Sequence, residues 1–168
     1  MARIEFVDAA TALAVNGYSK ADFPAKPHLL VEFHGTESAV AEQAEQFGAI
    51  ASDHGATGFD WATKPEDRSR LWEMRHKAYW AILASRQGAR AIVTDVCVPI
   101  SQLAEAVMET QADIEATGLP APILGHVGDG NFHAILLMDD TDEAEREKAK
   151  ALSHRMAERA LRMGGTIT

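Results

Sequence analysis

Two histidines flank a glycine-rich turn in the segment 125–133, Gly-His-Val-Gly-Asp-Gly-Asn-Phe-His. An Asp-Gly pair between two apolar runs predicts a β-hairpin, because a type I′ turn needs positive φ at both central positions. With Asp129 and Gly130 at the turn, His126 faces His133 on one side of the sheet, with Cβ atoms roughly 4.5–5.5 Å apart. Two imidazoles at that spacing can hold one divalent metal ion, or one anion when both are protonated. Two ligands leave a zinc site incomplete, since such sites use three or four protein ligands.

An arginine lies on the apolar side of the third predicted helix. Advancing by about 100° per residue places Tyr79 beside Trp72, with Arg75 near the middle of the same apolar arc. A guanidinium buried without a partner costs several kcal/mol, so Arg75 must meet an anion. Two partners fit this requirement: the carboxylate of Asp95 in the following strand, or the carboxylate of a bound ligand held by the planar guanidinium.

The alternation of polar and apolar residues predicts the elements that position these side chains. Several predicted strands are polar on one side and the hairpin is antiparallel, which favours an α+β fold with a mainly antiparallel sheet covered by helices on one face. The opposite face then carries the ligand of Arg75, the two histidines or a partner domain. Each of the five helices is expected to follow a strand. The predicted strands lie at 4–6, 28–34, 57–62 and 91–98, on both sides of the Asp-Gly turn and at 166–168, and the predicted helices lie at 8–17, 36–55, 65–83, 101–118 and 140–163.

The composition indicates a single acidic domain. With 168 residues, 46% of them hydrophobic, the chain is long enough for one well-buried core and too short for two. Acidic residues outnumber basic ones 25 to 16, and the net charge of −9 argues against binding to nucleic acids or to anionic lipids. No apolar run approaches the roughly 20 residues of a transmembrane helix. The single cysteine, Cys97, lies in an apolar run, which predicts a buried inert thiol in a reducing compartment, the cytoplasm.

Three blocks of sequence carry these residues in a fixed order. They are Leu71-Trp72-Glu73-Met74-Arg75-His76, Thr94-Asp95-Val96-Cys97-Val98-Pro99-Ile100-Ser101 and the hairpin segment 125–133. Together they resemble the C-terminal domain of FAD-linked oxidases, in particular D-lactate dehydrogenases of the cytochrome-linked type and the glycolate oxidase flavin subunit. The order and spacing of the three blocks make the resemblance specific, and it covers nearly the whole chain.

The resemblance implies a ferredoxin-like α+β domain that covers FAD bound by a preceding domain. It implies that His126 and His133 bind a divalent metal, commonly zinc, with a glutamate from a Gly-Glu-His-Gly block beyond residue 168, whose histidine is the catalytic base. Arg75 would bind the substrate carboxylate, the metal would polarise the 2-hydroxyl group, and C2 would transfer hydride to the flavin. The chain itself would then hold no catalytic residue, bind metal weakly and be inactive alone.

Val93 stands where relatives that act on longer diacids carry a lysine, which favours a small monocarboxylate such as D-lactate. The resemblance also implies a cytochrome or quinone as electron acceptor and a location peripheral to the inner membrane. The competing interpretation is a stand-alone, non-catalytic ligand- or metal-binding module, in which Arg75 and the histidines only satisfy neighbouring groups. Because the chain stops where a new strand begins, we expect one domain of a longer enzyme, which flanking FAD-binding and Gly-Glu-His-Gly sequences would reveal.

Overall fold

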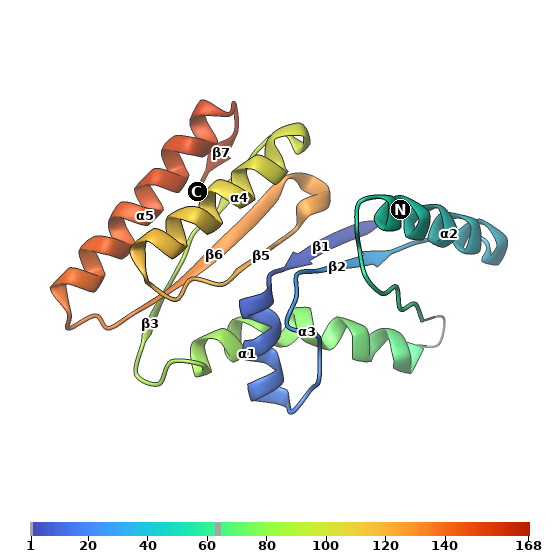
Figure 1. The fold of residues 1–168 in the computed structure, drawn as a ribbon, viewed down its shortest axis with the longest axis horizontal. Coiled ribbons are helices and arrows are strands. Elements are labelled where there is room, and N and C mark those ends of the chain that lie inside the picture. The colour runs from blue at the N-terminus through green and yellow to red at the C-terminus, as the bar shows by residue number, and fades with distance from the viewer. Residues whose placement is uncertain (1, 63–64) are drawn as a thin grey trace.

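The computed structural model describes residues 2–62 and 65–168, without the side chains at positions 65, 67, 70 and 71. Within this part, five α-helices pack on one seven-stranded sheet (Figure 1). The elements in chain order are β1 (Arg3–Val7), α1 (Ala9–Ser19), β2 (His28–Glu32), α2 (Glu37–Asp53), α3 (Pro65–Ala84), β3 (Arg90–Val93), β4 (Val96–Cys97), α4 (Ile100–Thr117), β5 (Ile123–Gly125), a 3-10 turn η1 (Val127–Asp129), β6 (Asn131–Met138), α5 (Glu143–Arg162) and β7 (Thr166–Ile167).

Capping residues set the helix boundaries largely where the sequence predicts them. Asp8 accepts a hydrogen bond from the backbone N–H of Thr11 at the start of α1, and Thr36 caps α2 in the same way. Gly118 ends α4 in the left-handed conformation, with φ of 69°. The predictions at these three positions are confirmed. Helix α5 begins later than predicted, because Asp142 rather than the residue at 140 is its N-cap.

The sheet is antiparallel throughout and has the strand order β2-β1-β5-β6-β4-β7. Strand β3 also pairs with β6, in line with β4, so the predicted strand at 91–98 is present in two pieces. The register is the same in both pieces, which places Asp95 opposite His133. The C-terminal strand predicted at 166–168 is confirmed as β7, paired with β4. The α+β class with a mainly antiparallel sheet is therefore confirmed.

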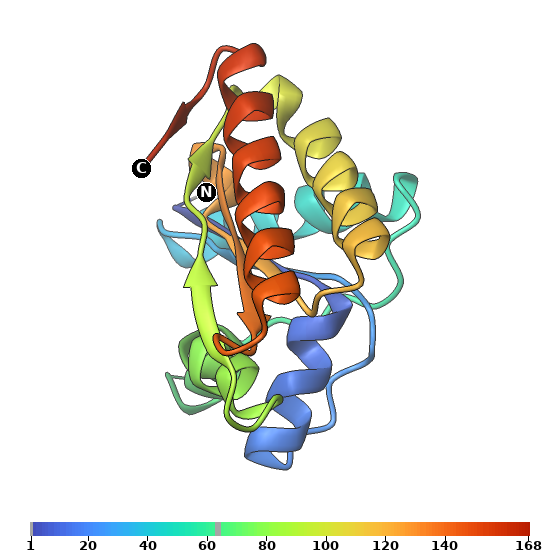
Figure 2. The same ribbon diagram turned by 90° about the vertical axis from the view of Figure 1, so that its left-hand side faces the viewer.

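Alternate residues of β6 point to opposite faces of the sheet and belong to two separate hydrophobic cores. Helices α4 and α5 lie side by side over one face, where they cover Phe132, Ala134, Leu136 and Met138 (Figure 2). Helices α1 and α3 pack together and cover one end of the opposite face. There they bury the residues of the second core that come from the sheet: Val7, Leu124, Ile135 and Leu137. The two histidines lie on the rest of that face, which is one of the three occupants that the sequence analysis allowed for it.

The strand predicted at 57–62 does not form, so α3 is the one helix of the described part that does not follow a strand. Gly55 and Gly58 both have positive φ, of 81° and 89°, which breaks the extended conformation that the alternating side chains suggested. The segment is instead irregular chain, and Phe59 packs against Phe47 of α2 with ring centroids 6.0 Å apart.

Asp8 joins the start of α1 to β5, and its loss is expected to destabilise the fold by about 2–4 kcal/mol. Its two carboxylate oxygens accept hydrogen bonds from the N–H of Thr11 at 2.7 Å and of Ile123 at 2.9 Å. Asp8→Ala removes a helix cap worth ~1 kcal/mol and leaves a buried N–H without an acceptor, which costs ~1–3 kcal/mol more. Urea denaturation measures the loss. Asp142→Ala is the matched control, since Asp142 is an exposed cap, and should cost only ~1 kcal/mol.

The contribution of Asp8 should also depend on pH. Burial raises the pKa of its carboxyl above the ordinary value, although the backbone N–H groups of Ile123 and Thr11 lower it. The folded protein then binds this proton more tightly than the unfolded chain, so stability from Asp8 falls as the pH rises through the interval between the two pKa values. We therefore expect a larger difference in unfolding free energy between wild type and Asp8→Ala near pH 4 than at pH 7, and the opposite trend would contradict the raised pKa.

Candidate functional site

The hairpin that carries the two histidines has a different register from the predicted one. Strand β5 pairs with β6 through Ile123 with Ala134 and Leu124 with His133, so the predicted pairing of His126 with His133 is wrong. The turn is the 3-10 segment η1 followed by Gly130 with φ of 78°, whereas a type I′ turn would need positive φ at the preceding aspartate as well. The register differs by two residues, which preserves the side-chain face. The rings of His126 and His133 consequently still lie close together, with centroids 6.2 Å apart and planes at 89°.

The residue that organises the site is Glu5 of β1, which sequence reasoning missed. Its side chain is fully buried on the face shared with Val7. Arg75 Nε lies 2.8 Å from Oε2, while Arg3 Nε and His126 Nδ1 lie 2.9 Å and 2.6 Å from Oε1. Burial raises the pKa of Glu5, but the hydrogen bonds from Arg75, Arg3 and His126 outweigh it, so the pKa lies below its ordinary value. Glu5 is therefore held as a carboxylate between three donors.

Helix α3 brings Arg75 to this carboxylate. Met74 and Ala78 anchor the helix in the second core, and the Arg75 side chain is only 18% exposed. The buried guanidinium has an anion, as predicted, but the structural partner is Glu5 and not Asp95. Its Nη2 lies 3.4 Å from His126 Nε2, and no described residue accepts a hydrogen bond from Nη1. The outer edge of Arg75 therefore retains donors for a ligand.

His133 is held from the other side of β6. Its Nδ1 lies 3.0 Å from the carbonyl oxygen of Thr94 and 3.3 Å from a carboxylate oxygen of Asp95. Hydrogen bonds from Thr168 and Asn131 lower the pKa of Asp95, and both donors lie 2.6 Å from its oxygens. Asp95 thus supports His133, which explains why a poor strand former stands in the line of β3 and β4.

Both imidazoles are oriented in the way that metal-binding histidines usually are. Nδ1 of His126 faces a carboxylate and Nδ1 of His133 faces a carbonyl oxygen, so each ring donates from Nδ1 and keeps the lone pair of Nε2 for a ligand. This donor chemistry fits two positions of a divalent metal site. Across residues 2–62 and 65–168, no group of three or more histidine, cysteine, aspartate or glutamate side chains is placed to complete one.

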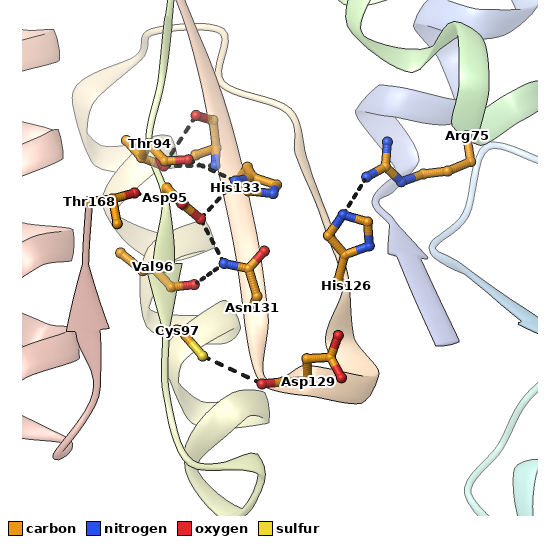
Figure 3. A network of polar contacts seen from close by, with 11 residues as sticks. Arg75, Thr94, Asp95, Val96, Cys97, His126, Asp129, Asn131, His133 and Thr168 are labelled. Carbon is orange, nitrogen blue, oxygen red and sulfur yellow. Dashed lines mark hydrogen bonds and ion pairs between the residues drawn. The ribbon is translucent and has the colours of Figure 1, made fainter. Parts of the chain in front are cut away.

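Figure 3 shows how side chains from separate elements meet at the site. Arg75 projects from α3 toward His126, which follows β5, and His133 projects from β6 toward the same space. Val93 is two positions before Asp95 and therefore lies on the same face, where its side chain is 49% exposed. Cys97, predicted to be a buried thiol, is half-buried, and its Sγ lies 3.4 Å from the carbonyl oxygen of Asp129.

The protein is thus an antiparallel α+β domain with an arginine and two histidines on one face of its sheet. Comparison with known proteins shows the family to which it belongs. Residues 1–168 match the family described as FAD linked oxidases, C-terminal domain. The chain therefore belongs to the C-terminal domain family of FAD-linked oxidases, as the three sequence blocks predict.

Curated relatives match the chain along its whole length. It is 43% identical over 168 residues to a probable mitochondrial D-lactate dehydrogenase from Danio rerio, covering all of this chain and 34% of the relative. It is 38% identical to a mitochondrial D-lactate dehydrogenase [cytochrome] from Arabidopsis thaliana, again over all of this chain and 30% of the relative. Glycolate oxidase subunit GlcD from Bacillus subtilis is 31% identical, with 99% of this chain and 36% of the relative covered. The chain spans about a third of the length of these relatives.

The fold also occurs in a solved structure. The chain superposes on 4-ethylphenol oxidase from Gulosibacter chungangensis, in its isoeugenol complex, with a TM-score of 0.66 and 13% sequence identity. The superposition covers 97% of this chain and 38% of that one. At this identity the likeness concerns the fold alone. None of the helices in the described residues is long and apolar enough to cross a membrane.

Proposed function

We propose that the chain is the substrate domain of an FAD-dependent oxidoreductase that oxidises a small D-2-hydroxy acid, such as D-lactate, to the 2-oxo acid by hydride transfer to the flavin. The observation that carries the proposal is the adjacency of a carboxylate-binding group and an imidazole. Arg75 Nη2 and His126 Nε2 are 3.4 Å apart, and both side chains are held by Glu5. A 2-hydroxy acid has its carboxylate and hydroxyl on neighbouring carbons, which suits this spacing. Membership of an FAD-linked oxidase family supplies the redox partner.

Each site residue has one role in this proposal. Arg75 binds the substrate carboxylate through its outer nitrogens, since its Nε is occupied by Glu5. His126 and His133 present Nε2 as ligands for a divalent ion, for which zinc is the proposed identity. When bound, such an ion polarises a hydroxyl group and so makes its proton easier to remove. The base that takes this proton is expected in the Gly-Glu-His-Gly block of the family and not among these residues.

The side chain at position 93 restricts the size and charge of the substrate. Val93 is about half exposed on the same sheet face as His133 and Asp95. An aliphatic side chain cannot pair with a second carboxylate, so burying a diacid there would leave a charge without a partner. The proposal therefore favours a monocarboxylate. A cytochrome or quinone as acceptor, and a cytoplasmic location peripheral to the inner membrane, stay predictions.

Flavin bleaching in the full-length protein tests the reaction. Under anaerobic conditions, D-lactate is expected to bleach the flavin absorbance, L-lactate to leave it unchanged, and D-2-hydroxyglutarate to bleach it more slowly. Removal of bound metal with EDTA should slow bleaching by D-lactate, and added zinc should restore it. Absence of bleaching by every D-2-hydroxy acid would reject the reaction, and faster bleaching by the diacid would reject the role given to Val93.

One observation favours the alternative of a non-catalytic module. Glu5 neutralises Arg75 within the chain, so the guanidinium does not require a ligand to be stable. A module of this kind would bind a carboxylate or a metal ion without reducing any flavin. The bleaching experiment separates the two functions, because only the enzyme changes the absorbance.

A further inference from the structure

Among the described residues, Glu5 is the only one whose carboxylate contacts both Arg75 and His126. One oxygen accepts the hydrogen bond from Arg75 Nε, and the other accepts from His126 Nδ1. Arg3 closes the remaining side: its Nε lies 2.9 Å from Glu5, and its guanidinium carbon lies 4.3 Å from the centroid of the Trp72 ring. A carboxylate with no exposed surface would be costly alone, and three donors offset that cost.

We propose that Glu5 is a positioning residue that sets the tautomer of His126 and the direction of Arg75 at the same time. The inference rests on the proposed function, because it assigns a task to Glu5 in the same site. Glu5 is a positioning residue and not a catalytic one, since its own oxygens are occupied by protein donors.

The tautomer follows from the chemistry of the carboxylate. An ionised carboxylate can only accept hydrogen bonds, so a contact of 2.6 Å requires that Nδ1 of His126 carry the hydrogen. A neutral imidazole then has its lone pair on Nε2, the atom that lies beside Arg75. With the hydrogen on Nε2 instead, two donors would face each other at 3.4 Å. Glu5 thus keeps the nitrogen that faces the site free to accept a proton, a hydrogen bond or a metal ion.

The orientation of the Arg75 guanidinium follows from which of its nitrogen atoms donates to Glu5. A guanidinium can pair with a carboxylate through both Nη atoms or through Nε and one Nη. The contact here is made by Nε, which turns the edge formed by the two Nη atoms away from Glu5. A substrate carboxylate would meet that edge, whose Nη2 also lies 3.4 Å from His126 Nε2. One buried side chain therefore fixes the carboxylate anchor and the imidazole acceptor relative to each other.

A measurement without any substitution tests the tautomer. In a neutron crystal structure of the full-length protein, we expect a deuterium atom on His126 Nδ1 and none on Nε2. Deuterium on Nε2 with Nδ1 bare would overturn the inference. The position of this atom does not depend on the substrate, so a failure of the inference and a failure of D-lactate oxidation can be told apart.

Glu5→Gln tests the consequence for the site. Arg75 and His126 contact different oxygens of Glu5, so in the amide one of these two positions becomes an NH₂ group, which repels the donor that faces it. We expect kcat/KM for D-lactate to fall between about 10- and 100-fold, with a higher KM and a lower kcat, and the flavin spectrum to stay unchanged.

Glu145→Gln is the matched control for this substitution. It removes the same charge from another arginine pair, with Arg86 at 2.8 Å, away from both histidines. The control should keep the kinetic constants of wild type. A Glu5→Gln protein that melts at a lower temperature but retains the wild-type kcat and KM would show a purely structural role and overturn the inference. If Glu5→Gln does not fold, the neutron structure of the wild type decides.

Discussion

Arg75→Lys in the full-length protein is expected to lower kcat/KM for D-lactate by about two orders of magnitude, or ~3 kcal/mol. A lysine keeps the positive charge but has one nitrogen, and the carboxylate of Glu5 is the nearest partner for it. The ammonium that pairs with Glu5 then has no second, fixed donor edge for the substrate. The loss should therefore appear mainly as a higher KM, with flavin binding unchanged.

Arg86→Lys provides the comparison for this prediction. Arg86 also pairs with a glutamate, Glu145, and hydrogen-bonds a backbone carbonyl, but lies outside the proposed site. The substitution should leave kcat/KM close to that of wild type. If Arg75→Lys instead lowers the unfolding free energy by several kcal/mol while kcat/KM stays near wild type, Arg75 is a structural partner of Glu5 and the substrate assignment is wrong.

Gly130→Ala should be the most destabilising small substitution in the hairpin, with a cost of more than about 4 kcal/mol or a failure to fold. A Cβ atom at this position would lie 2.1 Å from the carbonyl oxygen of Val98, which belongs to the backbone and has little freedom to move. The same glycine accepts the hydrogen bond from Val98 N at 2.9 Å. Relief of the clash would separate the turn from the segment after β4 and displace His126 and His133 with it.

Gly118→Ala separates the steric effect from the conformational one. Gly118 has φ of 69°, close to the 78° of Gly130, but an added Cβ there meets no atom within 4 Å. Its replacement should cost ~1–2 kcal/mol, the penalty for a left-handed alanine alone. Urea denaturation of both variants gives the difference. Equal losses would show that the hairpin can move away from Val98 and that the close approach is not required.

The sequence predicts the part of this fold that depends on local patterns. Alternation along the strands and apolar stripes along the helices predict five helices and an antiparallel sheet, and caps such as Asp8 and Thr36 mark helix starts. The same alternation places His126 and His133 on one face even though the hairpin register is wrong. A shift of two residues changes the pairing partner and leaves the side-chain face unchanged.

The part that could not be predicted depends on partners far along the chain. Glu5 stands in a short strand beside Arg3, where charged residues normally face solvent, and nothing local distinguishes it from an exposed glutamate. Its burial is favourable only because Arg75 and His126, 70 and 121 positions away, meet it. The irregular segment at 57–62 was missed for a related reason, since whether a glycine adopts positive φ is decided by the surrounding fold.

Strand β1 lies between β2 and β5 in the sheet, and this position has a consequence for synthesis on the ribosome. Strand β1 can pair with β2 early, but its other edge pairs with β5, whose Gly125 meets Phe6 only after about 120 further residues are made. At the usual translation speed this delay is about 6–24 s. Arg75 is made 70 residues after Glu5, whereas His126 is absent throughout this delay. The nascent chain therefore carries a strand that is paired on one edge only, and the contact between Glu5 and His126 forms only after the residues that follow β5 have been made.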